Sequence, residues 1–264
     1  MKKLLSGLRQ FQQNYVPSRQ ALMKELAKGQ HPRVLFIACS DSRVDPTIIT
    51  QAEIGDLFVI RNAGNIVPPY EATNGGEGAT IEYAIEALDI KQIIVCGHTQ
   101  CGAMKGILQL GELEEKMPLV YDWLRHTEAT RRLVEDNYGH LDKKEHLDAL
   151  VAENVLTQIE NLRTYPAIHS KLYRGDLAIH AWVYNIENGE ILAYDPETHA
   201  YVPPHSKLYA DEPEGFVVGK KPLVVEDNGQ SKFTEQPQPY WPGVNRLSPE
   251  QAARLYRGTP VSRR

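Results

Sequence analysis

Short apolar runs separated by amphipathic stretches predict alternating strands and helices. The runs Arg33–Ala38, Leu57–Arg61 and Gln92–Cys96 are rich in β-branched and aromatic residues, which is typical of buried strands. Between the last two runs, apolar residues recur at helical spacing and predict a helix over Glu77–Leu88. Strands that alternate with helices indicate an α/β protein, with a central, mainly parallel sheet flanked by helices.

The first 29 residues have a helical pattern of their own. Apolar residues recur at helical spacing from Leu4 to Tyr15, and we expect Pro17 to interrupt this helix. A second helix is expected from the cap Ser18 to about Lys28, closed by Gly29. Residues 1–29 are therefore interpreted as an N-terminal helical arm.

Two long helices and a hairpin are expected in the second half of the chain. The helices are predicted near Met117–Tyr138 and Glu145–Tyr165. Beyond them, Leu177–Ile186 and Glu190–Tyr194 flank a turn whose Asn-Gly pair favours a hairpin. This hairpin would add one antiparallel edge to the sheet, so residues 30–195 are interpreted as the central domain.

The pattern changes after Asp195. More than half of the 17 prolines lie beyond this residue and hydrophobic periodicity fades, so we expect 196–245 to be extended or weakly ordered. Ser248, Pro249 and Gln251 then form a helix-capping pattern, and Gly258 can close the short helix. Residues 196–264 are interpreted as a proline-rich C-terminal extension, which is either a docking peptide or a solvated tail.

Composition restricts the classes of partner. A hydrophobic content of 42% and a charged content of 24% are ordinary for a soluble globular protein. The net charge of −5 and the absence of a basic run interleaved with aromatics give no reason to expect nucleic acid. We expect no membrane span and no secretory signal, because no apolar stretch is long enough. Three cysteines make a disulfide framework unexpected, so we expect a cytoplasmic protein.

The candidate chemistry lies where two of the predicted strands end. Cys39-Ser-Asp41-Ser-Arg43 follows the first strand, and His98-Thr-Gln-Cys101 follows the third. Loops at the carboxyl ends of parallel strands are the usual place for a site. Two thiolates and one imidazole suit Zn²⁺, and three protein ligands leave the fourth position for water or an acid.

Asp41 and Arg43 suggest that the fourth position can be switched. Two thiolates already balance the charge of the ion, so a bond from Asp41 to zinc should be breakable, and Arg43 can take the released carboxylate. We expect a closed state with Asp41 on zinc and an open state with Asp41 on Arg43. Bound zinc lowers the pKa of water to roughly 7, and activity should therefore rise above neutral pH.

Simpler explanations exist for each residue taken alone. Cys39 could be a core thiol, which is how we interpret Cys96, and His98 could be a hydrogen-bonded loop histidine. Asp41 and Arg43 could form a structural ion pair. A structural zinc site also stays open, although such sites usually have four Cys or His ligands in local pairs.

The motifs resemble those of a known family. Cys-Ser-Asp-Ser-Arg at 39–43 and Gly-His-Thr-Gln-Cys-Gly at 97–102 are similar to the two signatures of the β-class carbonic anhydrases, and 61–65 and 78–83 also match that family. The resemblance covers about 30–195. It implies Zn²⁺ bound by Cys39, His98 and Cys101, with Asp41 and Arg43 as the catalytic dyad. It also implies reversible hydration of carbon dioxide to bicarbonate.

Within that family, the pocket resembles the plant-like subtype. The resemblance implies that Gln30, Phe58, Tyr83 and Gly102 bind substrate, with Phe58 and Tyr83 contributed at a dimer interface. Position 36 is Phe rather than the Trp of the bicarbonate-inhibited bacterial subtype, so we expect an open site.

The chain with its tail is most similar to the carboxysomal members of the family from cyanobacteria, through 121–132 and 254–258. This implies a homodimer or higher even oligomer, a place with Rubisco inside the carboxysome, and contact with a carboxysome scaffold protein, possibly through the extension. Two alternatives stay open: a carbon disulfide or carbonyl sulfide hydrolase on the same scaffold, and a non-catalytic zinc-bearing assembly protein.

Overall fold

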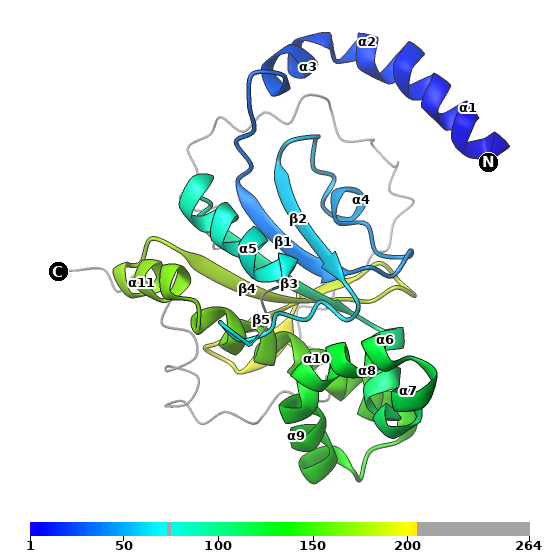
Figure 1. Ribbon diagram of the computed structural model, residues 1–264, viewed down its shortest axis with the longest axis vertical. Helices are drawn as coiled ribbons and strands as arrows, with labels where there is room; N and C mark the ends of the chain where they lie inside the picture. The colour runs from blue at the N-terminus through cyan, green and yellow to red at the C-terminus, as the bar shows by residue number, and fades with distance from the viewer. Residues whose placement is uncertain (73–74, 205–264) are drawn as a thin grey trace, which may run out of the picture.

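The protein folds around one six-stranded sheet, seen in the computed structural model, which describes residues 1–72 and 75–204 (Figure 1). The strand order is β2-β1-β3-β4-β5-β6. The strands are β1 (Val34–Cys39), β2 (Leu57–Asn62), β3 (Gln92–His98), β4 (Ala178–Tyr184), β5 (Ile191–Asp195) and β6 (Ala200–Val202). The first four pair in parallel, and β5 and β6 are antiparallel. The predicted α/β fold with a mainly parallel sheet and an antiparallel edge is confirmed.

Strand β6 was not predicted as an element of the sheet. It lies beyond Asp195, in the segment that we expected to be extended or weakly ordered. Tyr201 explains its order, because the side chain is buried and its hydroxyl donates to the Ala152 carbonyl at 2.9 Å. The predictions for 205–245 and for the helix near 248–258 lie outside the described residues.

The two faces of the sheet are covered unequally. The larger core lies on the face packed against α5 (Gly76–Glu82), the π-helical turn η2 (Tyr83–Ala87) and α10 (Lys143–Arg163). Helix α10 lies so close to β3 that a Cβ on Gly97 would come within 2.7 Å of Val155 Cγ2. The opposite face has a small core of Phe36, Ala38, Val44, Ile94 and Cys96, near α4 (Pro46–Thr50).

The N-terminal arm differs in detail from the prediction. Helix α1 (Lys2–Gln10) continues through a π-helical segment, η1 (Phe11–Tyr15), into α2 (Val16–Ser18), so Pro17 does not interrupt it. The π-helical turn widens the backbone before the proline, where Val16 N–H donates to Phe11 O. Ser18 is not a cap of α3 (Gln20–Leu26), because its hydroxyl donates back to Tyr15 O. Figure 1 shows the arm, in dark blue, running away from the sheet.

The helix predicted near 117–138 is also wrong as a single element. It is divided into α8 (Pro118–Leu124), a 3₁₀ turn η3 (Arg125–Thr127) and α9 (Glu128–Tyr138). Buried Thr127 donates its hydroxyl to Leu124 O at 2.6 Å, which supplies the local bond that competes with a regular helix. The sequence analysis also missed the helices α4, α6 (Gly102–Ile107), α7 (Leu110–Lys116) and α11 (Pro166–Arg174). None of the described helices is long and apolar enough to cross a membrane.

Candidate metal centre

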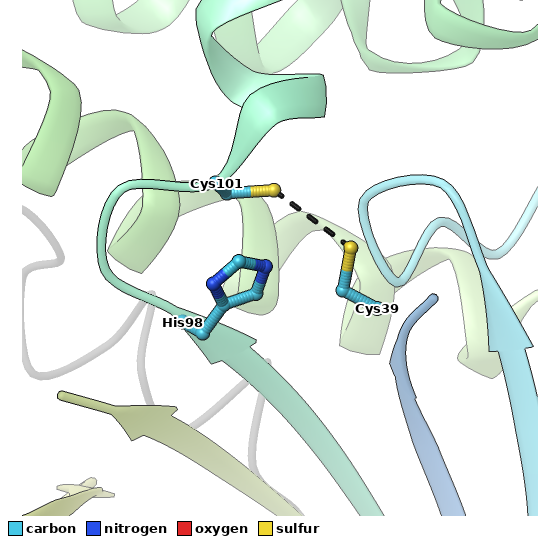
Figure 2. Close-up of side chains that lie close together, drawn as sticks. All are labelled: Cys39, His98 and Cys101. Carbon is cyan, nitrogen blue, oxygen red and sulfur yellow. Dashed lines mark hydrogen bonds between the residues drawn. The ribbon is translucent and has the colours of Figure 1, made fainter. Parts of the chain in front are cut away.

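Three predicted ligands meet at the carboxyl edge of the sheet. Cys39 ends β1, His98 ends the neighbouring strand β3, and Cys101 is the residue before α6. All three side chains are buried, and one ligand atom from each lies within 4.8 Å of the others (Figure 2). The parallel pairing of β1 with β3 therefore brings together residues that are about sixty positions apart in the sequence.

The histidine is prepared to bind a metal. His98 Nδ1 lies 2.9 Å from the Thr99 carbonyl oxygen, so this nitrogen carries the proton and Nε2 carries the lone pair. Nε2 is buried without a hydrogen-bond partner among the described residues. A buried polar atom in this state is destabilising unless something else binds it. A soft dication between one imidazole and two thiolates would satisfy it, so the residues fit Zn²⁺.

The two cysteines affect each other's protonation. Their sulfurs lie 4.0 Å apart. The pKa of Cys39 is lowered, mainly because the Cys101 thiol donates a hydrogen bond to it and further because the Gly64 amide does so. The pKa of Cys101 is raised, because the same bond holds its proton. A metal binds both sulfurs as thiolates, so metal binding would release the proton held between them.

Asp41 lies beside this cluster and pairs with Arg43. Arg43 donates from Nε to Asp41 Oδ1 at 2.9 Å and from Nη2 to Oδ2 at 2.7 Å, and its backbone amide donates to Oδ1 at 3.0 Å. These bonds hold the pKa of the Asp41 carboxyl well below its usual range and raise that of Arg43. Oδ2 is also 3.9 Å from His98 Nε2. This is the arrangement expected of the open state, and exchange onto the metal stays a prediction.

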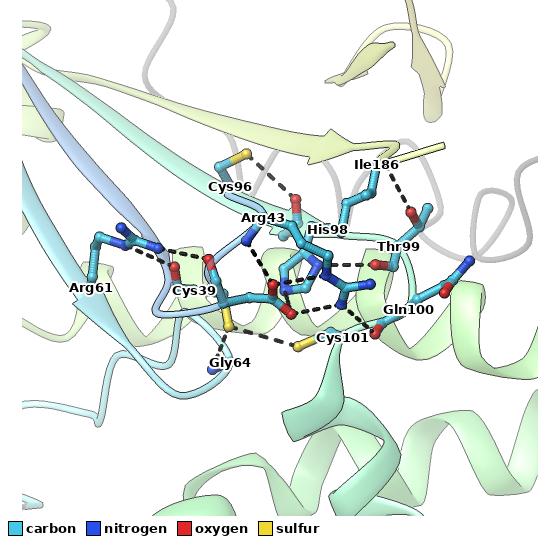
Figure 3. A network of polar contacts seen from close by, with 12 residues as sticks. Cys39, Arg43, Arg61, Gly64, Cys96, His98, Thr99, Gln100, Cys101 and Ile186 are labelled. Atoms are coloured by element: carbon cyan, nitrogen blue, oxygen red, sulfur yellow. Dashed lines mark hydrogen bonds and ion pairs between the residues drawn. The ribbon is translucent and has the colours of Figure 1, made fainter. Parts of the chain in front are cut away.

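Arg61 supports the backbone of the site, and the sequence reasoning missed it. Its Nε donates to Cys39 O at 3.1 Å, and its Nη2 donates to Asp41 O at 2.8 Å, so it fixes the backbone that carries both residues (Figure 3). The sequence analysis placed Arg61 in a family-matching segment but gave it no role. Arg61 lies on β2 opposite Ala38 of β1, so its long side chain can reach the backbone of the residues that follow β1.

Three of the four residues predicted to bind substrate lie away from the candidate metal ligands within one chain. Gln30 is exposed and precedes β1, and Phe58 pairs with Leu35 at the amino end of that strand. The register puts Phe58 about 13 Å along the strand from the level of Cys39. Tyr83 is 49% exposed, and its ring centre is 6.1 Å from that of Phe58. One chain does not bring these residues to the cluster, and their place in a pocket at a subunit interface stays a prediction.

Gly102 and Cys96 lie nearer the metal cluster but differ in character. Gly102 begins α6 directly after Cys101, and a Cβ added there would meet nothing within 4 Å. Cys96 is fully buried, and its thiol donates to Gly97 O at 3.4 Å. Burial raises the pKa of Cys96 to about 12, so it is the core thiol that we expected.

Known proteins are similar to this chain over most of its length. The carbonic anhydrase family model matches residues 34–191. The carbonic anhydrase of Synechocystis sp. is 57% identical over 98% of this chain and 100% of that protein. That of Synechococcus elongatus is 62% identical over 73% of this chain and 71% of that protein.

Solved structures agree with the sequence relatives. The β-carbonic anhydrase CcaA is 64% identical, with a TM-score of 0.76 over 77% of this chain and 99% of that chain. A tetrameric β-carbonic anhydrase of Sordaria macrospora is 30% identical, with a TM-score of 0.65 over 73% of this chain and 95% of that chain.

Proposed function

This chain belongs to the β-carbonic anhydrase family, and from that membership we propose that it interconverts carbon dioxide and bicarbonate at a zinc ion held by Cys39, His98 and Cys101. The observation that carries the proposal is the buried cluster of two sulfurs and one unpartnered imidazole nitrogen. When bound, zinc would supply a Lewis acid that activates water near neutral pH.

Asp41 and Arg43 would orient the reacting water. The Asp41 carboxylate is ionised and lies at the rim of the cluster, so it can accept a hydrogen bond from water and direct a lone pair of that water at carbon dioxide. Arg43 fixes both carboxylate oxygens and keeps Asp41 off the metal position. The amide of Gly102, in the open first turn of α6, can hold a substrate oxygen.

The alternative functions are less well supported. A purely structural zinc site requires no detachable fourth ligand, yet Asp41 lies ready at this one. A carbon disulfide or carbonyl sulfide hydrolase would use the same metal ligands. The Synechocystis carbonic anhydrase aligns with 98% of this chain, which favours carbon dioxide as the substrate.

A matched pair of cysteine variants tests the proposal. Purified protein should hold one zinc per chain and hydrate carbon dioxide in a stopped-flow assay. Cys101→Ala should lose both, because two remaining ligands hold zinc weakly. Cys96→Ala removes an equally buried thiol outside the cluster and should keep both. Full activity in metal-free protein, or in Cys101→Ala, would contradict the proposal.

We also propose that this enzyme works in the carboxysome, where it would supply carbon dioxide to Rubisco. The support is the high identity to carbonic anhydrases from two cyanobacteria, one of which aligns with almost all of the chain, extension included. Deletion of 245–264 should leave zinc content and turnover intact but remove the protein from Rubisco-containing particles. If the truncated protein still sediments with those particles, the extension is not the contact.

A further inference from the structure

The peptide group between Ala63 and Gly64 lies against one of the candidate metal ligands. The amide of Gly64 donates to Cys39 Sγ at 3.4 Å (Figure 3). The carbonyl of the same peptide unit belongs to Ala63, and it accepts from Trp123 Nε1 at 2.8 Å. The Trp123 indole, the Ala63–Gly64 peptide and the Cys39 sulfur therefore form a continuous chain of hydrogen bonds.

The peptide is held so that it cannot turn away. Gly64 has φ +84°, and a Cβ there would lie 2.9 Å from Met104 Cε and 3.0 Å from Ala103 Cβ. Its own carbonyl accepts from buried Asn154 on α10 at 3.0 Å. The Asn62 side chain closes the same loop with two bonds of 2.8 Å to the backbone of Ile66. The N–H direction toward the sulfur is thus fixed by the fold.

Packing alone does not explain Trp123. The residue is half-buried at the margin of the larger core, and its ring meets that of His126 edge to face at 5.8 Å. Those contacts account for the ring but not for the placement of its N–H. That N–H meets the carbonyl whose peptide unit touches a metal ligand, across 60 positions of sequence.

Linked hydrogen bonds polarise one another, by roughly 10–30% per bond in a low-dielectric interior. A donor on the Ala63 carbonyl makes the Gly64 N–H a stronger donor to the sulfur. A thiolate that accepts a stronger hydrogen bond gives less electron density to its metal, and outer partners of this kind tune metal sites.

We propose that Trp123 is a positioning residue that acts through the Ala63–Gly64 peptide to reduce electron donation by Cys39 and so keep the bound ion a stronger Lewis acid. This inference rests on the proposed zinc site and deepens it.

The test removes only the N–H donor of the Trp123 ring. Trp123 is exchanged for β-(3-benzothienyl)alanine, which keeps the shape of the ring system but has sulfur in place of N–H. Zinc is exchanged for Co²⁺, whose thiolate-to-metal charge-transfer band reports electron donation by sulfur. The band should move to longer wavelength, and turnover of the zinc form should fall about tenfold, the low end for loss of an outer partner.

Ordinary variants extend the test. Trp123→Phe should give the same shift, and if it fails to fold, the isosteric replacement still decides the matter. Trp182→Phe removes an indole from β4 on the opposite face and should leave the band in place. A band at the same wavelength in the isosteric variant as in the unsubstituted protein would overturn the role of Trp123. A missing band in the unsubstituted protein would instead overturn the metal site itself.

Discussion

Asp41 illustrates how one side chain is tuned by its neighbours. Three hydrogen bonds from Arg43 keep its carboxylate charged and hold it beside the candidate metal position. In Asp41→Asn the amide cannot accept in the same way, and we expect zinc content to stay constant while turnover falls about a hundredfold, within the usual range for a proton acceptor. Stopped-flow hydration with metal analysis measures both quantities. Unchanged turnover would remove Asp41 from the mechanism.

Asp41 should affect the pH dependence of stability in acid but not the pH dependence of activity. Because the pKa of Asp41 is lowered, its pair with Arg43 stabilises the fold above the ordinary carboxyl pKa of about 3.9, and this contribution is lost only as pH falls below that value. Asp41 is therefore ionised throughout the neutral range. An activity rise between about pH 6 and 9 must then come from water on the metal, and it should persist in Asp41→Asn. A profile that is flat in the unsubstituted protein would contradict this.

Gly64 should be sensitive to a single methyl group. Gly64→Ala adds strain at φ +84° and a clash with Met104 and Ala103, whereas Gly189→Ala adds strain at φ +77° with nothing within 4 Å. We expect the Gly189 variant to lose about 1 kcal/mol of unfolding free energy. The Gly64 variant should lose about 2 kcal/mol more, since overpacking adds to the strain. Denaturant titration of both variants measures the difference, and equal losses would disprove the close packing.

Residues whose role depends on the end of a strand could be predicted from the sequence. Cys39, Asp41 and His98 follow apolar runs, so their convergence was foreseeable. Arg61 and Trp123 were not, because each acts on a backbone group that only the tertiary fold brings near. Short motifs carry information on ligands but little on the backbone that orients them.

At the scale of elements, the first five strands were predicted to within a few residues, but β6 and the short helices were not. The central strands β1 and β3 are buried on both faces, so their apolar runs are unmistakable. Helices α4, α6 and α7 span only one to two turns, too few to show a period. Pro17 led to the opposite error. We expected it to end a helix, but the helix continues because the π-helical turn before it accommodates the proline ring.

Helix α10 contributes a buried row of amides as well as apolar packing. Gln158 is fully buried and accepts from the Val67 backbone amide at 2.8 Å, while its Nε2 donates to Asn154 Oδ1, also at 2.8 Å. Asn154 in turn holds Gly64, so this row connects the helix to the loop beside the metal.

Leucine is similar in size to glutamine, but Gln158→Leu should still lower the free energy of unfolding. It leaves the Val67 amide buried without an acceptor, and we expect a loss of about 2 kcal/mol in unfolding free energy. Glu160→Leu, at an exposed position on the same helix, should change it by less than about 0.5 kcal/mol. Thermal or denaturant unfolding compares the two, and similar values would show that the amide row is dispensable.

At the scale of the molecule, the arm has no surface to cover among the residues that the structure describes. No residue of α1 is buried, and Leu4 and Leu8 are 69% and 52% exposed. An exposed apolar face of this kind is typical of an interaction site, and we expect a second subunit to cover it. This fits an even oligomer, as does the tetrameric relative.

Substitutions on the two faces of α1 test this assignment. Leu4→Ser combined with Leu8→Ser should shift the protein to a lower mass in sedimentation experiments, because it removes apolar contacts. Ser6→Ala alters the opposite face of the same helix and should leave the mass unchanged. An oligomer that tolerates the double substitution would place the interface elsewhere.

The parallel neighbours β1 and β3 impose an order on folding. Cys39 and Cys101 are 62 positions apart, and they meet only after the centre of the sheet has closed across a long intervening segment. Closure of long segments is slow compared with helix formation. Metal capture during refolding should therefore be a late event, and the uptake of a coloured ion would serve as a clock for completion of the sheet.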